Sequence, residues 1–155
     1  MSTPVDNIAL RLSPFVLSIM RIAVALCFLE HGTSRLFGFP SPLPTPPLFT
    51  LYWFAGAIEF VGGALVLVGL FTRPAAFVMS GEMAFAYFIS HFPKSFFPIL
   101  NRGDGAILYC FTFLYLAFAG AGPWSVDAWL KGGRRSGAAI PPAFSAHSTA
   151  ARRRY

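Results

Sequence analysis

The segment LFTLYWFAGAIEFVGGALVLVGLF, residues 48–71, carries a single charged side chain, that of Glu59. A helix that spans a bilayer needs about 20 predominantly apolar residues, so this segment is long enough to cross a membrane. Tyr52 and Trp53 stand near its start, and aromatic rings with a polar edge favour the membrane–water interface. We therefore expect a transmembrane helix over this range.

Three further apolar segments, at about 14–35, 74–92 and 104–122, have a similar character, with Pro and Gly mostly at their ends. The first should begin at Ser13-Pro14, because proline is tolerated at the first helical position. The 155-residue chain is 55% hydrophobic and 12% charged, whereas an average soluble domain is about 25% charged. This composition excludes a disordered chain and a disulfide-stapled secreted module, and it fits an ordinary soluble globule poorly.

The predicted fold is all-α: residues 1–131 form an integral membrane, antiparallel four-helix bundle. The short connection near Thr72 predicts that the second and third spans are antiparallel neighbours. The sequence WSVDAWLK, residues 124–131, is expected to form a short interfacial helix capped by Ser125. Residues 132–155 are rich in Gly, Ala, Ser, Pro and Arg, so we expect a basic, disordered cytoplasmic tail.

The distribution of basic residues predicts the orientation in the membrane. With four crossings both termini share a side, and that side carries more basic residues close to the spans: Arg11, Arg73, Lys131, Arg134 and Arg135. The opposite side carries Arg35, Lys94 and Arg102. Since Lys and Arg gather on the cytoplasmic side, both termini should be cytoplasmic. The net charge of +6 then points to the bilayer and its anionic headgroups as a partner, not to nucleic acid.

Three carboxyl groups lie inside predicted membrane spans, where an ionised side chain is energetically costly. Only six residues are acidic, and Glu30, Glu59 and Glu82 all fall within predicted spans. A charge at the bilayer centre costs about 2.5–3.5 kcal/mol on insertion scales, which makes such groups functional candidates. Glu59 shares a helical face with Gly56, Gly62 and Gly63, so it should face a neighbouring helix. We expect Glu59 and Glu82 at similar depth to exchange protons; the structural alternative is that both are neutral and hydrogen-bonded.

Other polar residues converge at the outer ends of the predicted spans, on the side of the membrane away from the cytoplasm. They are Glu30, His31 and Arg35 in the first, His91 in the third, and Asn101 and Asp104 in the fourth. A histidine beside carboxylates fits a proton relay, so His91 joins Glu59 and Glu82 as a catalytic candidate and the others are candidates for binding substrate. The spacing matches no zinc motif, and we expect no metal. The alternative for Asn101 and Asp104 is a helix N-terminus.

Three buried positions leave alternatives open. Arg21 could reach the cytoplasmic interface or pair with a buried carboxylate. Cys27 and Cys110 are expected to be small buried hydrophobes, and a redox pair would require Cα atoms within about 7 Å. The sequence has no nucleotide, flavin or haem motif, but its 18 Phe residues allow a cavity for an apolar ring such as a quinone.

Four motifs resemble those of the DoxX family of membrane proteins. They are HGTSRLFG (31–38), EFVGGALVLVGLFTR (59–73), NRGD (101–104) and GAGPWSVD (120–127). The similarity covers about residues 15–130. Two positions depart from the family pattern: Arg35 stands where Lys is usual and Asp104 where Glu is usual, which changes the shape of one charge and the reach of the other.

The resemblance implies a four-helix protein of the bacterial inner membrane. Relatives are linked to quinone-dependent thiosulfate oxidation, or to membrane oxidoreductase complexes that handle thiols and oxidative stress. The polar positions that match the family signatures are Glu59, His91, Asn101 and Asp104.

Three functional hypotheses follow. The first is a membrane subunit of a quinone- or thiol-linked oxidoreductase that uses the buried carboxylates for proton exchange and works with periplasmic or cytoplasmic redox partner proteins. The second is non-enzymatic: a small-solute or proton-coupled carrier, or an assembly factor for partner proteins. The third is purely structural. Self-association into a homo-oligomer stays open.

Overall fold

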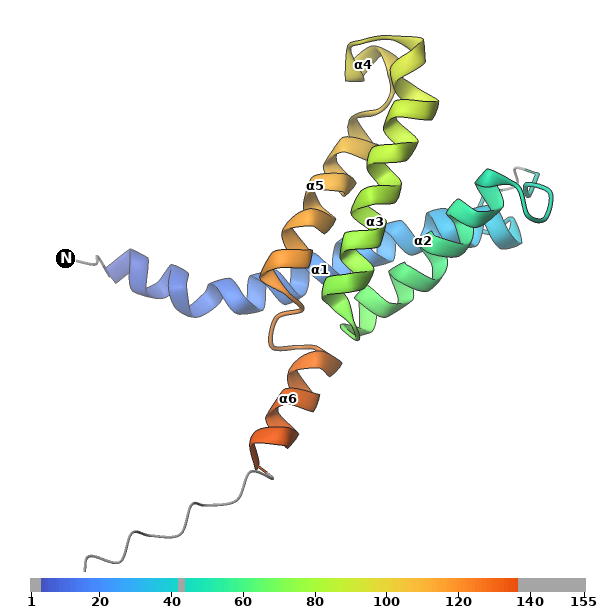
Figure 1. Cartoon of the computed structure of the whole chain (residues 1–155). Helices are drawn as coiled ribbons and strands as arrows, with labels where there is room; N and C mark the ends of the chain where they lie inside the picture. Colours follow the sequence, from blue (N-terminus) through green and yellow to red (C-terminus); the bar gives the residue numbers. More distant parts are fainter. Residues whose placement is uncertain (1–3, 42–43, 137–155) are drawn as a thin grey trace, which may run out of the picture.

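The computed structural model describes residues 4–41 and 44–136, and every regular element in these ranges is a helix (Figure 1). The long elements are α1 (Pro4–Phe37), α2 (Leu51–Val68), α3 (Thr72–Ala86), α5 (Asp104–Ala119) and α6 (Val126–Ser136). A π-helical turn η1 (Tyr87–His91), a 3-10 turn η2 (Phe92–Lys94) and the single turn α4 (Pro98–Asn101) connect α3 to α5. The predicted all-α class is confirmed, and each predicted span lies on a helical segment.

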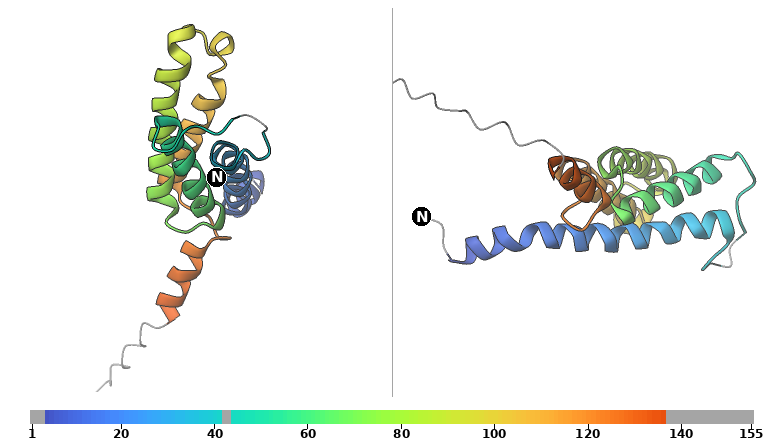
Figure 2. Two further views of the ribbon diagram at one scale, coloured as in Figure 1. Left: turned by 90° about the vertical axis from the view of Figure 1, so that its right-hand side faces the viewer. Right: turned by 90° about the horizontal axis from the view of Figure 1, so that it is seen from below.

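The helices pair into two antiparallel hairpins that cross each other. One hairpin is α1 with α2, and the other is α3 with α5. Figures 1 and 2 show the second hairpin running across the first, with α2 and α3 diverging from the corner that joins them. The second and third spans are thus neighbours at a corner and not along their length. A four-helix bundle, in which helices lie within about 20° of one another, is not confirmed.

Helix α1 begins at Pro4, so the predicted start at Pro14 is wrong and this proline lies inside the helix. Proline has no N–H to donate to the carbonyl four residues back, that of Leu10. The hydroxyl of Ser13 donates to that carbonyl at 3.2 Å. This local bond supplies a donor for the freed carbonyl and lets the helix continue through Pro14.

Glycines allow α1 and α2 to touch through their backbones. A Cβ added to Gly32 would lie 2.5 Å from the backbone nitrogen of Phe60 on α2, and one added to Gly63 would lie 3.3 Å from Leu29 of α1. The predicted face of α2 is confirmed, because Gly56, Glu59 and Gly63 are buried. In lipid no hydrophobic driving force holds helices together, and small residues allow the close packing that does so instead.

We expect Gly32→Ala to lower the free energy of unfolding by about 1–3 kcal/mol, because the new methyl meets rigid backbone and must push the helices apart. Thermal unfolding of the full chain in detergent measures this loss. Gly105→Ala is the matched control, since a Cβ at Gly105 has no neighbour within 4 Å. Equal stability of the two variants would contradict the close contact.

The corner between α2 and α3 is held by the segment that leads into α6. Gly69 (φ 73°) and Phe71 (φ 49°) adopt the left-handed conformation that turns the chain. The carboxylate of Asp127 accepts hydrogen bonds from the backbone N–H groups of Phe71 and Thr72, both at 3.0 Å. It thereby caps the start of α3, whose first N–H groups have no partner within the helix.

Asp127 lies outside the membrane-spanning helices, and its pKa reflects this capping role. Burial alone would raise the pKa of the carboxyl group, but the hydrogen bonds from Thr72 and Phe71, with the charge of Lys131, outweigh burial and hold the pKa below its usual value. A carboxyl whose pKa is lowered by folding stabilises the folded state when it is ionised, above about pH 4. This stabilisation is lost as the pH falls through the lowered pKa.

Asp127→Asn should therefore lower the free energy of unfolding by about 0.5–2 kcal/mol at neutral pH, the usual range for losing a cap. The difference from wild type should shrink below about pH 4, where the wild-type carboxylate also becomes protonated. Thermal unfolding at pH 7 and pH 3 measures both values, with Glu30→Gln, an exposed carboxylate, as control. A difference that is as large at pH 3 as at pH 7 would contradict the capping role.

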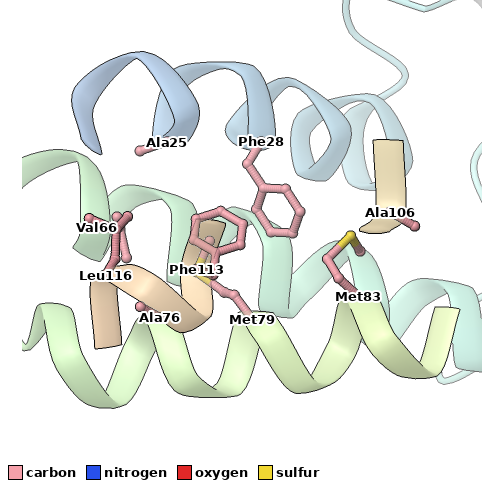
Figure 3. Packing of buried hydrophobic residues seen from close by; sticks show 9 residues of the cluster. All are labelled: Ala25, Phe28, Val66, Ala76, Met79, Met83, Ala106, Phe113 and Leu116. Carbon is pink, nitrogen blue, oxygen red and sulfur yellow. The ribbon is translucent and has the colours of Figure 1, made fainter. Parts of the chain in front are cut away.

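The hydrophobic core lies where the two hairpins cross. Its buried side chains come from α1, α2, α3 and α5 and are drawn in Figure 3: Ala25, Phe28, Val66, Ala76, Met79, Met83, Ala106, Phe113 and Leu116. At its centre the rings of Phe28 and Phe113 meet edge to face, with centroids 4.7 Å apart. This contact joins α1 to α5 and fixes the crossing.

Apolar side chains also cover much of the surface. Helix α1, over Val5–Phe37, and α2 are long and apolar enough to cross a membrane by length and composition, whereas α5 is apolar but shorter. Helix α3 continues without a break through η1 and η2 to Lys94, which lengthens the third helical segment. Such a surface fits a lipid environment better than water.

The predicted interfacial helix forms as α6, and Ser125 caps it: the Ser125 hydroxyl accepts from the N–H of Ala128 at 3.2 Å. The helix runs to Ser136, so the prediction of disorder from residue 132 is wrong for residues 132–136. Residues 137–155, the rest of the predicted tail, lie outside the described residues.

Candidate functional site

A cavity of about 520 Å³ lies between α2 and the α3–η1 segment, on the side where the crossing hairpins diverge. We call it the polar cavity, because five polar side chains line it: Arg35, Tyr52, Glu82, Ser90 and His91. The remaining wall is apolar and comes from α2, between Leu51 and Ile58, and from α3 and η1, between Val78 and Ile89. A largely apolar pocket with a few convergent polar groups is typical of small-molecule sites.

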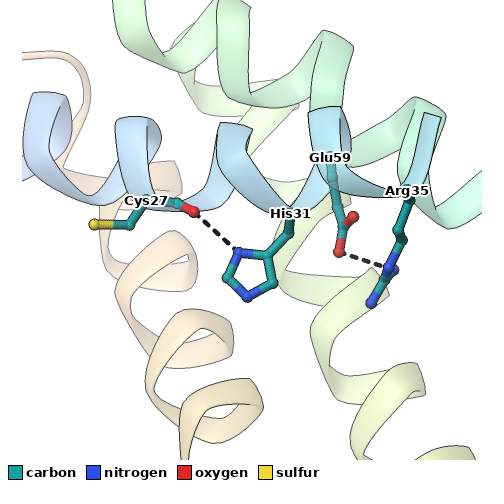
Figure 4. Close-up of polar contacts among 4 residues, drawn as sticks. All are labelled: Cys27, His31, Arg35 and Glu59. Atoms are coloured by element: carbon teal, nitrogen blue, oxygen red, sulfur yellow. Dashed lines mark hydrogen bonds and ion pairs between the residues drawn. The ribbon is translucent and has the colours of Figure 1, made fainter. Parts of the chain in front are cut away.

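Arg35 and Glu59 form an ion pair at the edge of this cavity (Figure 4). The guanidinium Nη1 lies 2.9 Å from Oε1 of Glu59, and Glu59 is fully buried while the Arg35 side chain is 32% exposed. Gly56 makes room for the pair, because a Cβ there would lie 2.9 Å from Cβ of Arg35. In the described part of the chain, Arg35 is the one charged partner of this buried carboxylate.

Glu82 supplies a second carboxyl group at the same place. Both its carboxyl oxygens are buried, and within the described residues neither accepts a hydrogen bond. The charges of Glu59 and Arg35 both act on Glu82, so the three groups belong to one electrostatic unit. A buried carboxyl without a partner is costly unless it is protonated or meets a ligand, which makes Glu82 the most distinctive group in the cavity.

The π-helical turn η1 brings His91 to the cavity. Nine residues separate Glu82 from His91, so an unbroken α-helix at about 100° per residue would place them on opposite sides. In η1 the N–H of Phe92 bonds to the carbonyl of Tyr87, five residues back, and this wider turn rotates His91 towards the side of Glu82. Nδ1 of His91 lies 3.0 Å from the carbonyl oxygen of Asn101, which leaves the Nε2 edge for a ligand.

Asn101 has a structural role. It is buried, its side-chain amide donates to the carbonyl of Ser95 at 2.7 Å, and its Oδ1 accepts from the N–H of Gly103 at 2.7 Å. These bonds close the loop between η2 and α5 and so position the carbonyl that His91 contacts. The predicted alternative, that Asn101 caps the next helix, is wrong, because the N-cap of α5 is Gly103 and no side chain caps it. A role of Asn101 in substrate binding stays a prediction.

Three of the predicted outer residues lie away from the polar cavity. Glu30 is exposed on α1, because it is turned by about 200° from the buried Gly32 on the same helix. His31 faces α5, with its Nδ1 2.9 Å from the carbonyl of Cys27 and its ring against Tyr109 (Figure 4). Asp104 is exposed at the first turn of α5. The predicted convergence therefore holds for Arg35 and His91 and is wrong for these three.

Arg21 is a buried residue whose role the sequence left open. Its guanidinium donates to four backbone carbonyls, those of Val66, Leu67, Ala121 and Trp124. Two of them belong to the last turn of α2, where carbonyls lack helical partners. Arg21 thus neither reaches the interface nor pairs with a carboxylate; it ties α1 to the end of α2 and to the segment before α6.

The two cysteines are free. Cys27 is exposed on α1, so the expectation of a buried side chain is wrong for it, whereas Cys110 is half-buried. The hydroxyl of Ser80 donates to the carbonyl of Cys110 at 2.9 Å and lies 3.6 Å from its sulfur. Among the residues that the structure describes, no group of three or more His, Cys, Asp or Glu could hold a metal ion.

The polar cavity also contains residues that sequence reasoning missed. Tyr52 was interpreted only as an interfacial ring and Ser90 was not singled out, yet both line the cavity. Ser90 lies in the π-helical turn η1, which the spacing rule of an α-helix does not describe. The site can present one positive charge and one unpartnered carboxyl group to a small molecule, with an imidazole supplied by η1.

Comparison with known proteins agrees with this picture. The DoxX family matches residues 16–92, a range that includes Arg35, Glu59, Glu82 and His91. An uncharacterised protein of Haemophilus influenzae is 43% identical over 123 residues, which cover 74% of this chain and 90% of that protein. No solved structure matches the chain. With its apolar, membrane-length helices, the chain is therefore a membrane protein that belongs to the DoxX family.

Proposed function

We propose that this protein is the quinone-binding membrane subunit of a thiol- or thiosulfate-oxidising system. The observation that carries the proposal is the polar cavity, where Arg35, Glu82 and His91 line an otherwise apolar space beside Glu59. An apolar ring with two carbonyl oxygens matches such a lining: the ring contacts the apolar wall, and the oxygens need hydrogen-bond donors.

Reduction of a quinone to a quinol takes up two electrons and two protons, one proton on each carbonyl oxygen. In this proposal Arg35 donates a hydrogen bond to one oxygen and stabilises the negative charge that develops there. Glu82 transfers one proton to each carbonyl oxygen in turn and is protonated again between the two transfers. His91, at the outer end, exchanges protons with that side of the membrane.

Glu59 has a positioning role in this scheme. Its carboxylate fixes the guanidinium of Arg35 at 2.9 Å and balances the charge of Arg35 when the cavity is empty of ligand. The electrons come from a donor outside this chain, for example two thiols that are oxidised to a disulfide and release two electrons and two protons. A redox partner protein, periplasmic or cytoplasmic, delivers them.

The same proposal includes the location. We place the chain in a bacterial inner membrane with four crossings and both termini in the cytoplasm, as the distribution of basic residues favours. Because the hairpins cross (Figure 1), they would tilt in opposite directions within the membrane. Helix α1 has 34 residues and is about 51 Å long, so it exceeds the hydrocarbon thickness of about 30 Å even when tilted.

Quinol formation by membranes that contain the full chain tests the proposal. With a thiol or thiosulfate donor, we expect donor-dependent quinone reduction that is absent from matched membranes without the protein. Equal rates in the two membranes would contradict the oxidoreductase role. A solute or proton flux in proteoliposomes that Glu59→Gln abolishes would support the carrier hypothesis in its place.

A further inference from the structure

A second cavity continues the polar cavity along the same two helices. It has a volume of about 450 Å³, and it shares Phe54, Ile58 and Val78 with the polar cavity. From there it follows α2 and α3 towards the corner that joins them, past Ala57, Gly62 and Met79. We call this second cavity the apolar groove.

Among the residues that the structure describes, no ionisable or hydrogen-bonding side chain lines the apolar groove. Small residues create it: Ala57 and Gly62 on α2 face Ala75 on α3. A Cβ on Gly62 would lie 2.7 Å from the sulfur of Met79, so a larger residue there would push this side chain into the space. Gly62, which shares the predicted helix-contact face of Glu59, therefore also helps to form this groove.

We propose that the apolar groove binds the polyprenyl chain of the quinone whose ring occupies the polar cavity, an inference that rests on the proposed function. Continuity between the two cavities supports one amphiphilic ligand, with a polar head at Glu82 and an apolar chain running towards the corner. Exposed residues at the rim, among them Phe54, Val61 and Val78, face outward. The ligand can therefore enter sideways from the bilayer without passing through water.

The polyprenyl chain gains little free energy from burial alone, because the lipid that it leaves is as apolar as the groove. The contribution of the groove is packing and orientation, which holds the ring against Arg35 and Glu82. The sharpest test therefore locates the bound polyprenyl chain on the protein in addition to measuring the affinity for the quinone.

The experiment uses the full protein in lipid nanodiscs and a quinone that carries a photoreactive group within its polyprenyl chain. We expect cross-links on α2 and α3 at groove residues such as Ala57 and Ala75, competed by excess unlabelled quinone. Ala57→Phe fills the groove and should lower the cross-link yield about tenfold, because the chain loses its packing surface. Val68→Phe, on an exposed position of α2 that lines neither cavity, is the control and should leave the yield unchanged.

Two further probes separate the outcomes. A tail-less quinone should bind Ala57→Phe as it binds wild type, which shows that the variant folds and keeps the ring site. Ring binding together with cross-links spread over all lipid-facing residues would overturn the groove inference alone. A fatty acid with the same photoreactive group that labels the groove equally well would overturn the assignment to a polyprenyl chain. If the wild-type protein bound no quinone, with or without a polyprenyl chain, the proposed function would be overturned as well.

Discussion

Arg21→Met is expected to lower the free energy of unfolding by about 3 kcal/mol or more, because the carbonyl oxygens of Leu67, Ala121 and Trp124 lose a donor and each unsatisfied buried group costs about 1–3 kcal/mol. The carbonyl of Val66 keeps the N–H of Gly69 as a donor. Arg21 is buried, and its bonds reach residues that lie 45 to 103 positions away in the chain. Methionine keeps the apolar part of the side chain, so the loss measures the guanidinium.

Thermal unfolding of the full chain in detergent gives this value, with Arg11→Met as the matched control. Arg11 lies on the same helix but is exposed, and its replacement should change stability by less than about 0.5 kcal/mol. Arg21→Lys should fall between the two, because one ammonium group cannot reach four separated carbonyls. If Arg21→Met were no less stable than the control, the role of Arg21 in joining the helices would be wrong.

Glu82→Gln is expected to reduce the rate of quinone reduction about 100-fold or more, the usual contribution of a positioned general acid. Glutamine has nearly the same shape and removes the transferable proton, so the cavity and its volume should persist. We expect this loss mainly in kcat, with quinone binding retained, because the ring still meets Arg35 and the apolar wall.

Initial rates of quinol formation over a range of quinone concentrations separate these effects. Glu30→Gln is the control, since Glu30 lies on α1 outside the polar cavity, and it should retain wild-type rates. A full rate in Glu82→Gln would remove this residue from proton transfer, and a loss of binding with unchanged kcat would assign it to recognition of the ring.

Local sequence patterns were sufficient for the helices and for the buried face of α2. Glu59 could be placed in a helix contact because three glycines recur on its face, and this spacing is a property of one helix alone. Helix geometry also placed Glu30 nearly opposite Arg21, nine residues away on the same helix, but because the burial of Arg21 stayed open, the exposure of Glu30 could not be predicted. These inferences need no knowledge of the other helices.

The remaining features depend on contacts that no local pattern encodes. The acceptors around Arg21 are backbone carbonyls of distant segments, and backbone groups leave no signature in the sequence. His91 shares the cavity with Glu82 through a π-helical turn, which apolar spacing cannot predict. Crossing of the two hairpins likewise depends on how Phe28 and Phe113 pack in the core.

An experimental structure of the full chain saturated with a quinone tests the central claim most directly. We predict the ring in the polar cavity, with one carbonyl oxygen within hydrogen-bond distance of the Arg35 guanidinium and the ring edge against Glu82. A quinone bound at another surface, with Glu82 still facing an unfilled or lipid-filled cavity, would contradict the account.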